Sequence, residues 1–162
     1  MASDAVEKES LKDEMRSVVE EARMVIPGVQ ALFGFQTMAV FNNRFEELDP
    51  TGVAAYLAGL AMLAIAIALL MAPAAFHRLS ERGQVSRNLI DLASRLLTWG
   101  MVPLAIGLAL DVYVVLLAVL DDERIATGGG IAALALFVLL WFVLPGARRH
   151  VMVAGSTRLR RQ

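Results

Sequence analysis

The residues of this sequence that could do chemistry are polar side chains inside long apolar runs. Asp111 lies in the run 96–120, and Gln36 lies in the run 24–43. An acid inside hydrocarbon costs about 3 kcal/mol on insertion scales, so Asp111 must be neutral, paired or facing water. If the first and third runs cross in the same direction, a rise of 1.5 Å per residue places Gln36 about 12 Å, and Asp111 about 15 Å, from the same end. We therefore predict that Gln36 and Asp111 hydrogen-bond, within one subunit or between subunits, either as a structural clasp or as a stop for an ion or proton in a conduction path.

A second set of polar and small residues precedes and enters the first apolar run at intervals of three and four residues. This spacing is that of the seam of a heptad repeat, so the residues share one narrow face of a helix. The face consists of Glu20, Arg23, Pro27, Gln30, Gly34 and Thr37. It is either a packing seam in which Gln30 hydrogen-bonds a neighbouring helix, or the lining of a water-filled path with Glu20 and Arg23 at its cytosolic mouth.

The elements that must position these residues are predicted from the apolar runs. Of the 162 residues, 57% are hydrophobic, and the mean hydropathy is +0.61. A run of about 20 apolar residues makes a helix of about 30 Å, which matches the hydrocarbon core of a bilayer. The sequence therefore predicts an all-α integral membrane protein, a four-helix transmembrane bundle in one domain (1–162). The predicted spans are 24–43, 53–76, 96–120 and 125–147, preceded by an amphipathic cytosolic helix at about 4–23.

The connections and small residues refine this prediction. The segment 41–52 contains Asp49 and Pro50, which favour a short loop. The segment 121–130 is acidic and then glycine-rich, which favours a tight, mobile turn with the three glycines 128–130 inside it. Gly100, Pro103, Gly107 and Asp111 share one face of the third span, where we expect close helix packing or a bend.

Basic residues predict the orientation of the spans. Of the 15 lysines and arginines, only Arg44 and Arg124 lie on one side of the predicted topology. The positive-inside rule therefore places both termini and the middle loop in the cytoplasm. The outer loops carry six acids, Glu46, Glu47, Asp49, Asp121, Asp122 and Glu123. Such a rim either concentrates cations or only reflects topology.

Composition argues against several classes of function. The sequence has no cysteine and only two histidines, His77 and His150. We expect no disulfide, metal centre, haem or other cofactor, no nucleic-acid partner and no enzyme activity, since no nucleophile motif or phosphate-binding loop is present. His77 and Arg78 fall at the cytosolic edge of the second span, where they are either a pH-sensitive part of the mouth or merely interfacial.

Part of the sequence resembles an uncharacterised family of small four-span bacterial membrane proteins, found mainly in actinobacteria. The residues that carry the resemblance are Glu21, Arg23, Pro27, Gly28, Gln30, Leu32, Phe33, Phe35, Arg44, Phe45, Leu48, Ala72, Pro73, His77, Arg78 and Leu79. The resemblance is strongest over the first two spans and weak over the last two. It implies a protein of the bacterial inner membrane and transfers no activity. Gln36 and Asp111 lie outside the shared pattern.

These observations lead to two functional hypotheses. In the first, a homo-oligomer in the lipid bilayer forms a channel or transporter for a small cation or proton, with the polar face of the first span lining the path. In the second, the chain is a non-conducting scaffold or accessory subunit, and the same face binds protein. A central hydrated axis lined by Gln30 favours the first hypothesis, and a dry packed seam favours the second.

Overall fold

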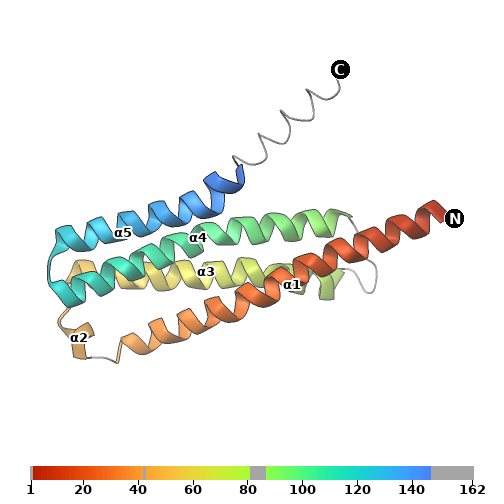
Figure 1. Cartoon of the computed structure of the whole chain (residues 1–162). Coiled ribbons are helices and arrows are strands. Elements are labelled where there is room, and N and C mark those ends of the chain that lie inside the picture. The colour runs from red at the N-terminus through yellow and green to blue at the C-terminus, as the bar shows by residue number, and fades with distance from the viewer. Residues whose placement is uncertain (1, 42, 81–86, 147–162) are drawn as a thin grey trace, which may run out of the picture.

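The structure, a computed structural model, describes residues 2–41, 43–80 and 87–146, and every element in them is helical (Figure 1). The helices are α1 (Ala2–Ala39), α2 (Asn43–Glu46), α3 (Pro50–Ser80), α4 (Arg87–Leu120) and α5 (Glu123–Val138), which continues into a π-helical turn, η1 (Leu139–Val143). The side chains of residues 2–12, the segment 81–86 and the tail from 147 onward, with His150, lie outside the described residues. The predicted all-helical class is confirmed.

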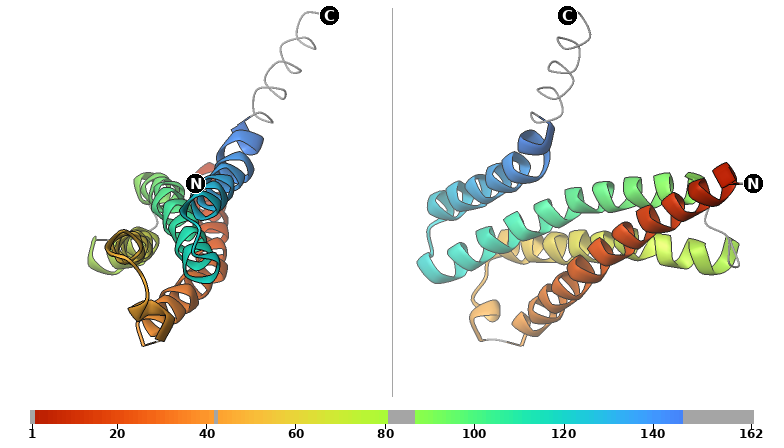
Figure 2. Two further views of the ribbon diagram at one scale, coloured as in Figure 1. Left: turned by 90° about the vertical axis from the view of Figure 1, so that its left-hand side faces the viewer. Right: turned by 45° about the vertical axis from the view of Figure 1, so that its right-hand side comes forward.

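The core of the molecule is the pair α3 and α4, which run antiparallel and share the most extensive helix contact (Figure 1). Helix α5 packs against α4, and the long α1 crosses α3 and α4 obliquely, as the two further views show (Figure 2). Leu63 and Ala66 of α3 are fully buried at the centre, together with Leu104 of α4 and Val29 of α1. Three long helices therefore meet in one apolar core.

Small residues set the separation of α3 and α4. A methyl group on Gly107 would lie 3.2 Å from the Leu63 side chain and 3.3 Å from the Gly59 carbonyl oxygen. A methyl group on Gly100 would lie 3.2 Å from the side chain of Leu70. The close packing that the sequence predicted for this face of α4 is confirmed.

The glycine-rich segment is helical, so the prediction of a turn over 121–130 is wrong beyond Asp122. The Asp122 side chain accepts hydrogen bonds from the backbone N–H groups of Arg124 and Ile125, and this cap starts α5 at Glu123. A methyl group on Gly130 would lie 3.1 Å from the Tyr113 Cβ atom and 3.3 Å from the Ala109 carbonyl oxygen. Gly129 and Gly130 therefore serve the contact between α5 and α4, whereas Gly128 faces open space, and the reversal itself is confined to Asp121 and Asp122.

Three helical segments are long and apolar enough to cross a membrane: Pro50–Phe76, Ile90–Leu120 and Glu123–Gly146. Helix α1, predicted as the first span over 24–43, is not among them. Its helix ends at Ala39, so its charge-free part from Met24 measures about 24 Å, against a hydrocarbon thickness of about 30 Å. The polar residues of this part also lower its mean hydropathy. A crossing by α1, and the amphipathic character of its first turns, therefore remain predictions.

The connection before α3 is a helix cap, which explains where α3 begins. The Asp49 carboxylate accepts a hydrogen bond of 2.8 Å from the Gly52 backbone N–H, and Pro50 occupies the first helical position. This geometry requires an oxygen acceptor in the Asp49 side chain but not its charge.

Replacing Asp49 with alanine should therefore destabilise the protein by about 1 kcal/mol, because the Gly52 N–H loses its acceptor. The measurement is the thermal unfolding midpoint of the purified full-length protein in detergent. Asp49→Asn is the matched control, since an amide oxygen also caps a helix, and its midpoint should stay close to that of the wild type. Equal midpoints for Asp49→Ala and Asp49→Asn would contradict the assigned cap.

Candidate functional site

The candidate site is a buried polar cluster where α1, α3 and α4 meet. Helix α1 packs on the bundle through one apolar face, which contains Val18, Ala22, Val25, Val29 and Phe33. Gln36 continues this face at helical spacing and is 7% exposed. Its side-chain N–H donates a hydrogen bond to the Asp111 carboxylate of α4. The hydrogen bond predicted from the similar depths of these two residues is therefore present, within one chain.

Tyr56 of α3 completes the cluster. Its hydroxyl donates a hydrogen bond to the backbone carbonyl of Gln36, and the whole residue is 3% exposed. The ring of Phe45, from the short helix α2, meets the Tyr56 ring edge-to-face with centroids 4.8 Å apart. The end of α1 is thus bound to α3 through Tyr56 and to α4 through Asp111.

Gly59 makes the space in which the Gln36–Asp111 pair lies. A methyl group on Gly59 would lie 3.1 Å from the Gln36 Nε2 atom and 3.3 Å from the Asp111 Oδ1 atom. The sequence alone did not place Tyr56 or Gly59 at this site. The available signal was the position of Gly59 one turn after Tyr56, in a helix that must pass close to a polar pair.

One atom of the cluster is left without a partner. Within the described part of the chain, the buried Gln36 Oε1 atom accepts no hydrogen bond. A buried amide oxygen that lacks a donor costs about 1–3 kcal/mol, so this position favours a proton donor or a small cation. The described residues contain no group of three or more histidine, cysteine or acidic side chains placed to hold a metal ion. The cluster therefore offers few oxygens, which suits a proton, a water molecule or a weakly held monovalent cation.

The polar face predicted on α1 lies on a different side of the helix from Gln36. Its residues are all exposed, and two of them, Arg23 and Pro27, border a groove shared with α3 and α4: Glu20, Arg23, Pro27, Gln30, Gly34 and Thr37. A methyl group on Gly34 would have nothing within 4 Å, and the Thr37 hydroxyl is satisfied by the Phe33 carbonyl of its own helix, at 2.8 Å. The structure thus divides the predicted path residues into two groups, the exposed polar face of α1 and the pair of buried Gln36 and half-buried Asp111.

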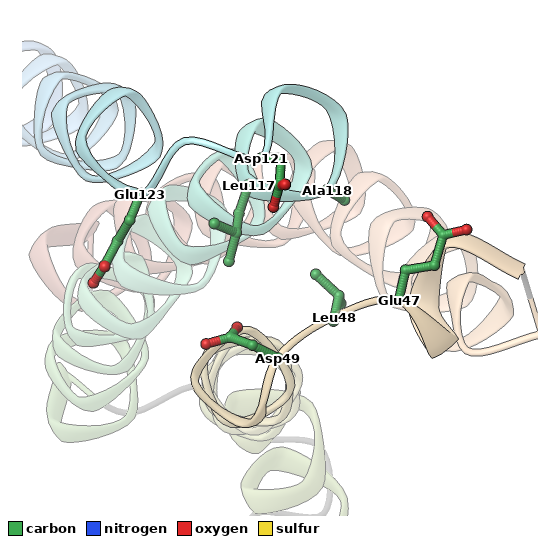
Figure 3. Close-up of a pocket in the computed structure, with 7 residues that line it drawn as sticks. All are labelled: Glu47, Leu48, Asp49, Leu117, Ala118, Asp121 and Glu123. Carbon is green, nitrogen blue, oxygen red and sulfur yellow. The ribbon is translucent and has the colours of Figure 1, made fainter.

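An acidic pocket lies at the end of the bundle formed by α2, the start of α3 and the α4–α5 turn. Its volume is about 410 Å³, and four carboxylates line it (Figure 3), those of Glu47, Asp49, Asp121 and Glu123. Leu48 and Leu117 also line the pocket. Asp121 directly follows the last residue of α4, ten residues after Asp111, and therefore lies about 15 Å further along the helix axis at 1.5 Å per residue. The pocket and the half-buried Asp111 therefore lie at successive depths along the direction of α4.

The two residues predicted at the opposite edge, His77 and Arg78, lie in the last turn of α3. Their side chains are outside the described residues, so their assigned role stays a prediction. The described residues thus contain three polar features, which are the cluster around Gln36 and Asp111, the exposed face of α1 and the acidic pocket.

Comparison with known proteins supplies a family and no activity. No curated protein and no solved structure matches the chain. A family model described as "Family of unknown function (DUF6328)" matches residues 4–145. This match covers α1 except for its first two residues and the whole of α2, α3, α4, α5 and η1, and it is consistent with the uncharacterised family that the sequence resembles. The chain belongs to the family of unknown function DUF6328.

Proposed function

We propose that this chain is a bacterial inner-membrane protein that moves a small cation or a proton across the bilayer as a homo-oligomer. Helices α3, α4 and α5 cross the membrane, α1 accompanies them as a fourth span, and both termini are cytoplasmic. The three helices long and apolar enough to cross, and the one-sided distribution of basic residues, support this arrangement. The acidic pocket then faces outward and raises the local concentration of cations.

The observation that carries the proposal is the position of Asp111. This acid lies inside a candidate span, at the buried meeting point of three helices, beside an amide oxygen that has no donor. Ionisable residues at such depth are rare in membrane helices and mark proton and ion pathways. The acidic pocket lies about 15 Å further along the same helix axis, so it concentrates cations at the end of the bundle from which they would approach Asp111.

The exposed polar face of α1 is the surface through which we expect copies of the chain to associate. Gln30 is exposed on a helix that belongs to a membrane bundle, and hydrocarbon offers an amide no hydrogen-bond partner. A second copy of the chain covers this face from Gln30 to Thr37, and water held between the copies leads along Gln30 from the cytosolic mouth at Glu20 and Arg23. Passage through the bilayer then uses the α1 face in one half and the Asp111 cluster in the other.

Flux through proteoliposomes tests this proposal. Wild-type protein should dissipate an imposed cation or proton gradient, and Asp111→Asn should slow the flux by about tenfold or more, equivalent to about 1.4 kcal/mol in the barrier. Asparagine keeps the shape of the side chain and can still accept the hydrogen bond from Gln36, but it cannot carry a proton or a charge.

The matched control is Asp91→Asn, which removes an exposed acid near the start of the same helix. Its flux should equal that of the wild type. Wild-type vesicles that pass neither protons nor monovalent cations would overturn the proposal. Equal flux for Asp111→Asn and wild type would remove Asp111 from the path.

A non-conducting scaffold is the second candidate, and the exposed polar face of α1 favours it. In that case the Gln36–Asp111 pair is a clasp that fixes α1, and the α1 face binds another protein or another copy. Gln30→Leu separates the two functions. If the scaffold role holds, this variant should change the oligomer seen by light scattering while wild-type and variant vesicles are both silent in the flux assay. If conduction holds, the variant should lower flux.

A further inference from the structure

An apolar groove lies between α1, α3 and α4, at the end of the bundle away from the acidic pocket. Its volume is about 640 Å³. Apolar side chains make up nearly all of the wall, among them Val19, Ile26, Leu70 and Leu97. Arg23 also lines the groove, with Pro27 one turn further along α1. The groove thus combines an apolar floor with one cation.

The depth of the groove matches the level of lipid headgroups. Pro73 lines it and lies one turn before Phe76, where one candidate span ends, and Ala93 lines it one turn after Ile90, where the next begins. One turn of helix is about 5 Å. The floor of the groove therefore reaches acyl-chain depth while its mouth lies at the boundary between hydrocarbon and headgroups.

The charge of Arg23 is available to a ligand. Glu20, the nearest acid on the same helix face, accepts a hydrogen bond of 3.1 Å from the Arg16 guanidinium. Within the described residues, no hydrogen bond or ion pair engages the Arg23 side chain. A guanidinium binds a phosphate oxygen pair in a planar, two-point geometry. The opposite end of the molecule carries four carboxylates around its pocket and would repel such a ligand.

We propose that this groove binds one anionic phospholipid, with an acyl chain along the apolar floor and the phosphate at Arg23. Such a lipid matches both the apolar floor of the groove and its one cation. Burial of the acyl chain stabilises the complex without selecting a headgroup, and the Arg23 guanidinium selects an anionic headgroup. The bound lipid fills the gap between α1 and the α3–α4 pair on the side away from Val29.

Native mass spectrometry of the full-length protein, released from detergent micelles, tests the proposal. The probes are phosphatidylglycerol and phosphatidylcholine with identical acyl chains. Wild-type protein should retain phosphatidylglycerol about fivefold better than phosphatidylcholine, the order of effect expected from one basic residue near an anionic headgroup. Arg23→Gln should abolish this preference by weakening phosphatidylglycerol binding more than phosphatidylcholine binding, because the choline ammonium of phosphatidylcholine offsets the charge of its phosphate and already opposes the guanidinium.

Variants of the groove floor provide the second arm. Ala74 is exposed and lines the groove, so Ala74→Phe should fill it and reduce retention of both lipids without disturbing the core. Ala64→Phe, an exposed alanine of α3 outside the groove, and Arg124→Gln, an exposed arginine at the other end, are the matched controls and should bind as the wild type does.

Any one of the following results would overturn the proposal. The first is a phosphatidylglycerol preference that survives Arg23→Gln, and the second is unchanged lipid retention in Ala74→Phe. The third is displacement of the lipid preference by inorganic phosphate alone, which would assign Arg23 to a free anion. A change of oligomer mass in Ala74→Phe without loss of lipid would show that a second copy occupies the groove, and would likewise reject the lipid.

Discussion

Replacing Gly107 with valine should lower the stability of the protein more than any other single change considered above, by about 3 kcal/mol. The Cβ atom of the new side chain would meet the Leu63 side chain at 3.2 Å and the Gly59 carbonyl oxygen at 3.3 Å. Leu63 is fully buried and cannot rotate away without a clash, and the Gly59 oxygen belongs to the backbone of α3. Valine therefore forces α3 and α4 apart, and overpacking of this kind costs about 1–3 kcal/mol for smaller insertions.

The measurement is the thermal unfolding midpoint of full-length protein in detergent, which should fall by roughly 2–4 °C for each kcal/mol in a chain of this size. Gly28→Val is the matched control. A methyl group on Gly28 has nothing within 4 Å, so the same substitution adds the same side chain without a clash. If Gly28→Val destabilises as much as Gly107→Val, helix propensity and not the α3–α4 contact sets the cost.

Replacing Gln36 with leucine should have the next largest effect on stability, a net loss of about 1–2 kcal/mol, because the lost hydrogen bond to the Asp111 carboxyl group outweighs removal of the Gln36 Oε1 atom, which accepts no hydrogen bond within the described residues. Leucine has a similar size, so packing against Gly59 is retained, but the Asp111 carboxyl group loses the N–H that hydrogen-bonds it. A buried polar group left without its partner costs about this amount. The bond from Tyr56 to the Gln36 backbone carbonyl does not involve the side chain and should persist.

A double-mutant cycle isolates the interaction between the two side chains. We expect Gln36→Leu combined with Asp111→Leu to be more stable than Gln36→Leu alone, because the double variant has no unpaired polar group in the cluster. The coupling energy should exceed about 0.5 kcal/mol, the level found for residues in direct contact. Additive effects of the two substitutions would contradict a direct hydrogen bond. The double variant also provides a folded protein with no ionisable group at this position for the flux assay.

The positions of Gln36 and Asp111 were accessible from sequence because depth in a bilayer is a one-dimensional quantity. Counting residues from the charged ends of two helices that run in the same direction places them at similar levels. Hydrocarbon allows a polar side chain few alternatives to a polar neighbour at its own depth. Depth alone therefore predicted the hydrogen bond between Gln36 and Asp111. It did not predict that Gln36 lies on the face of α1 that packs against the bundle, which only the structure shows.

The polar face of α1 was predicted correctly as a set of residues, but its surroundings were not predicted. Spacing places Glu20, Gln30 and Thr37 on one side of a helix, and the structure leaves that side exposed. Periodicity alone does not state which face packs within a chain and which is left for a partner. The face that packs within this chain is the apolar one that ends in Gln36, and it was obscured in the sequence because hydrophobic residues surround α1 on several sides.

The three glycines of α5 were misread for a local reason. Glycine is common in turns, and an acidic loop precedes these three. In a bundle of apolar helices, however, glycine also permits close contact between backbones. Only the position of Gly130 against Tyr113 and the Ala109 carbonyl oxygen distinguishes these two uses.

Gln36 of α1 is bound by two residues, Tyr56 and Asp111, which lie at very different distances along the chain. The Tyr56 hydroxyl reaches back 20 residues to Gln36, whereas Asp111 is 75 residues away from it. During synthesis, α1 can therefore be anchored to α3 as soon as α3 has been made, and the second attachment must wait for α4. A ribosome-bound chain that ends before α4 should hold α1 loosely, and completion of α4 should lock it.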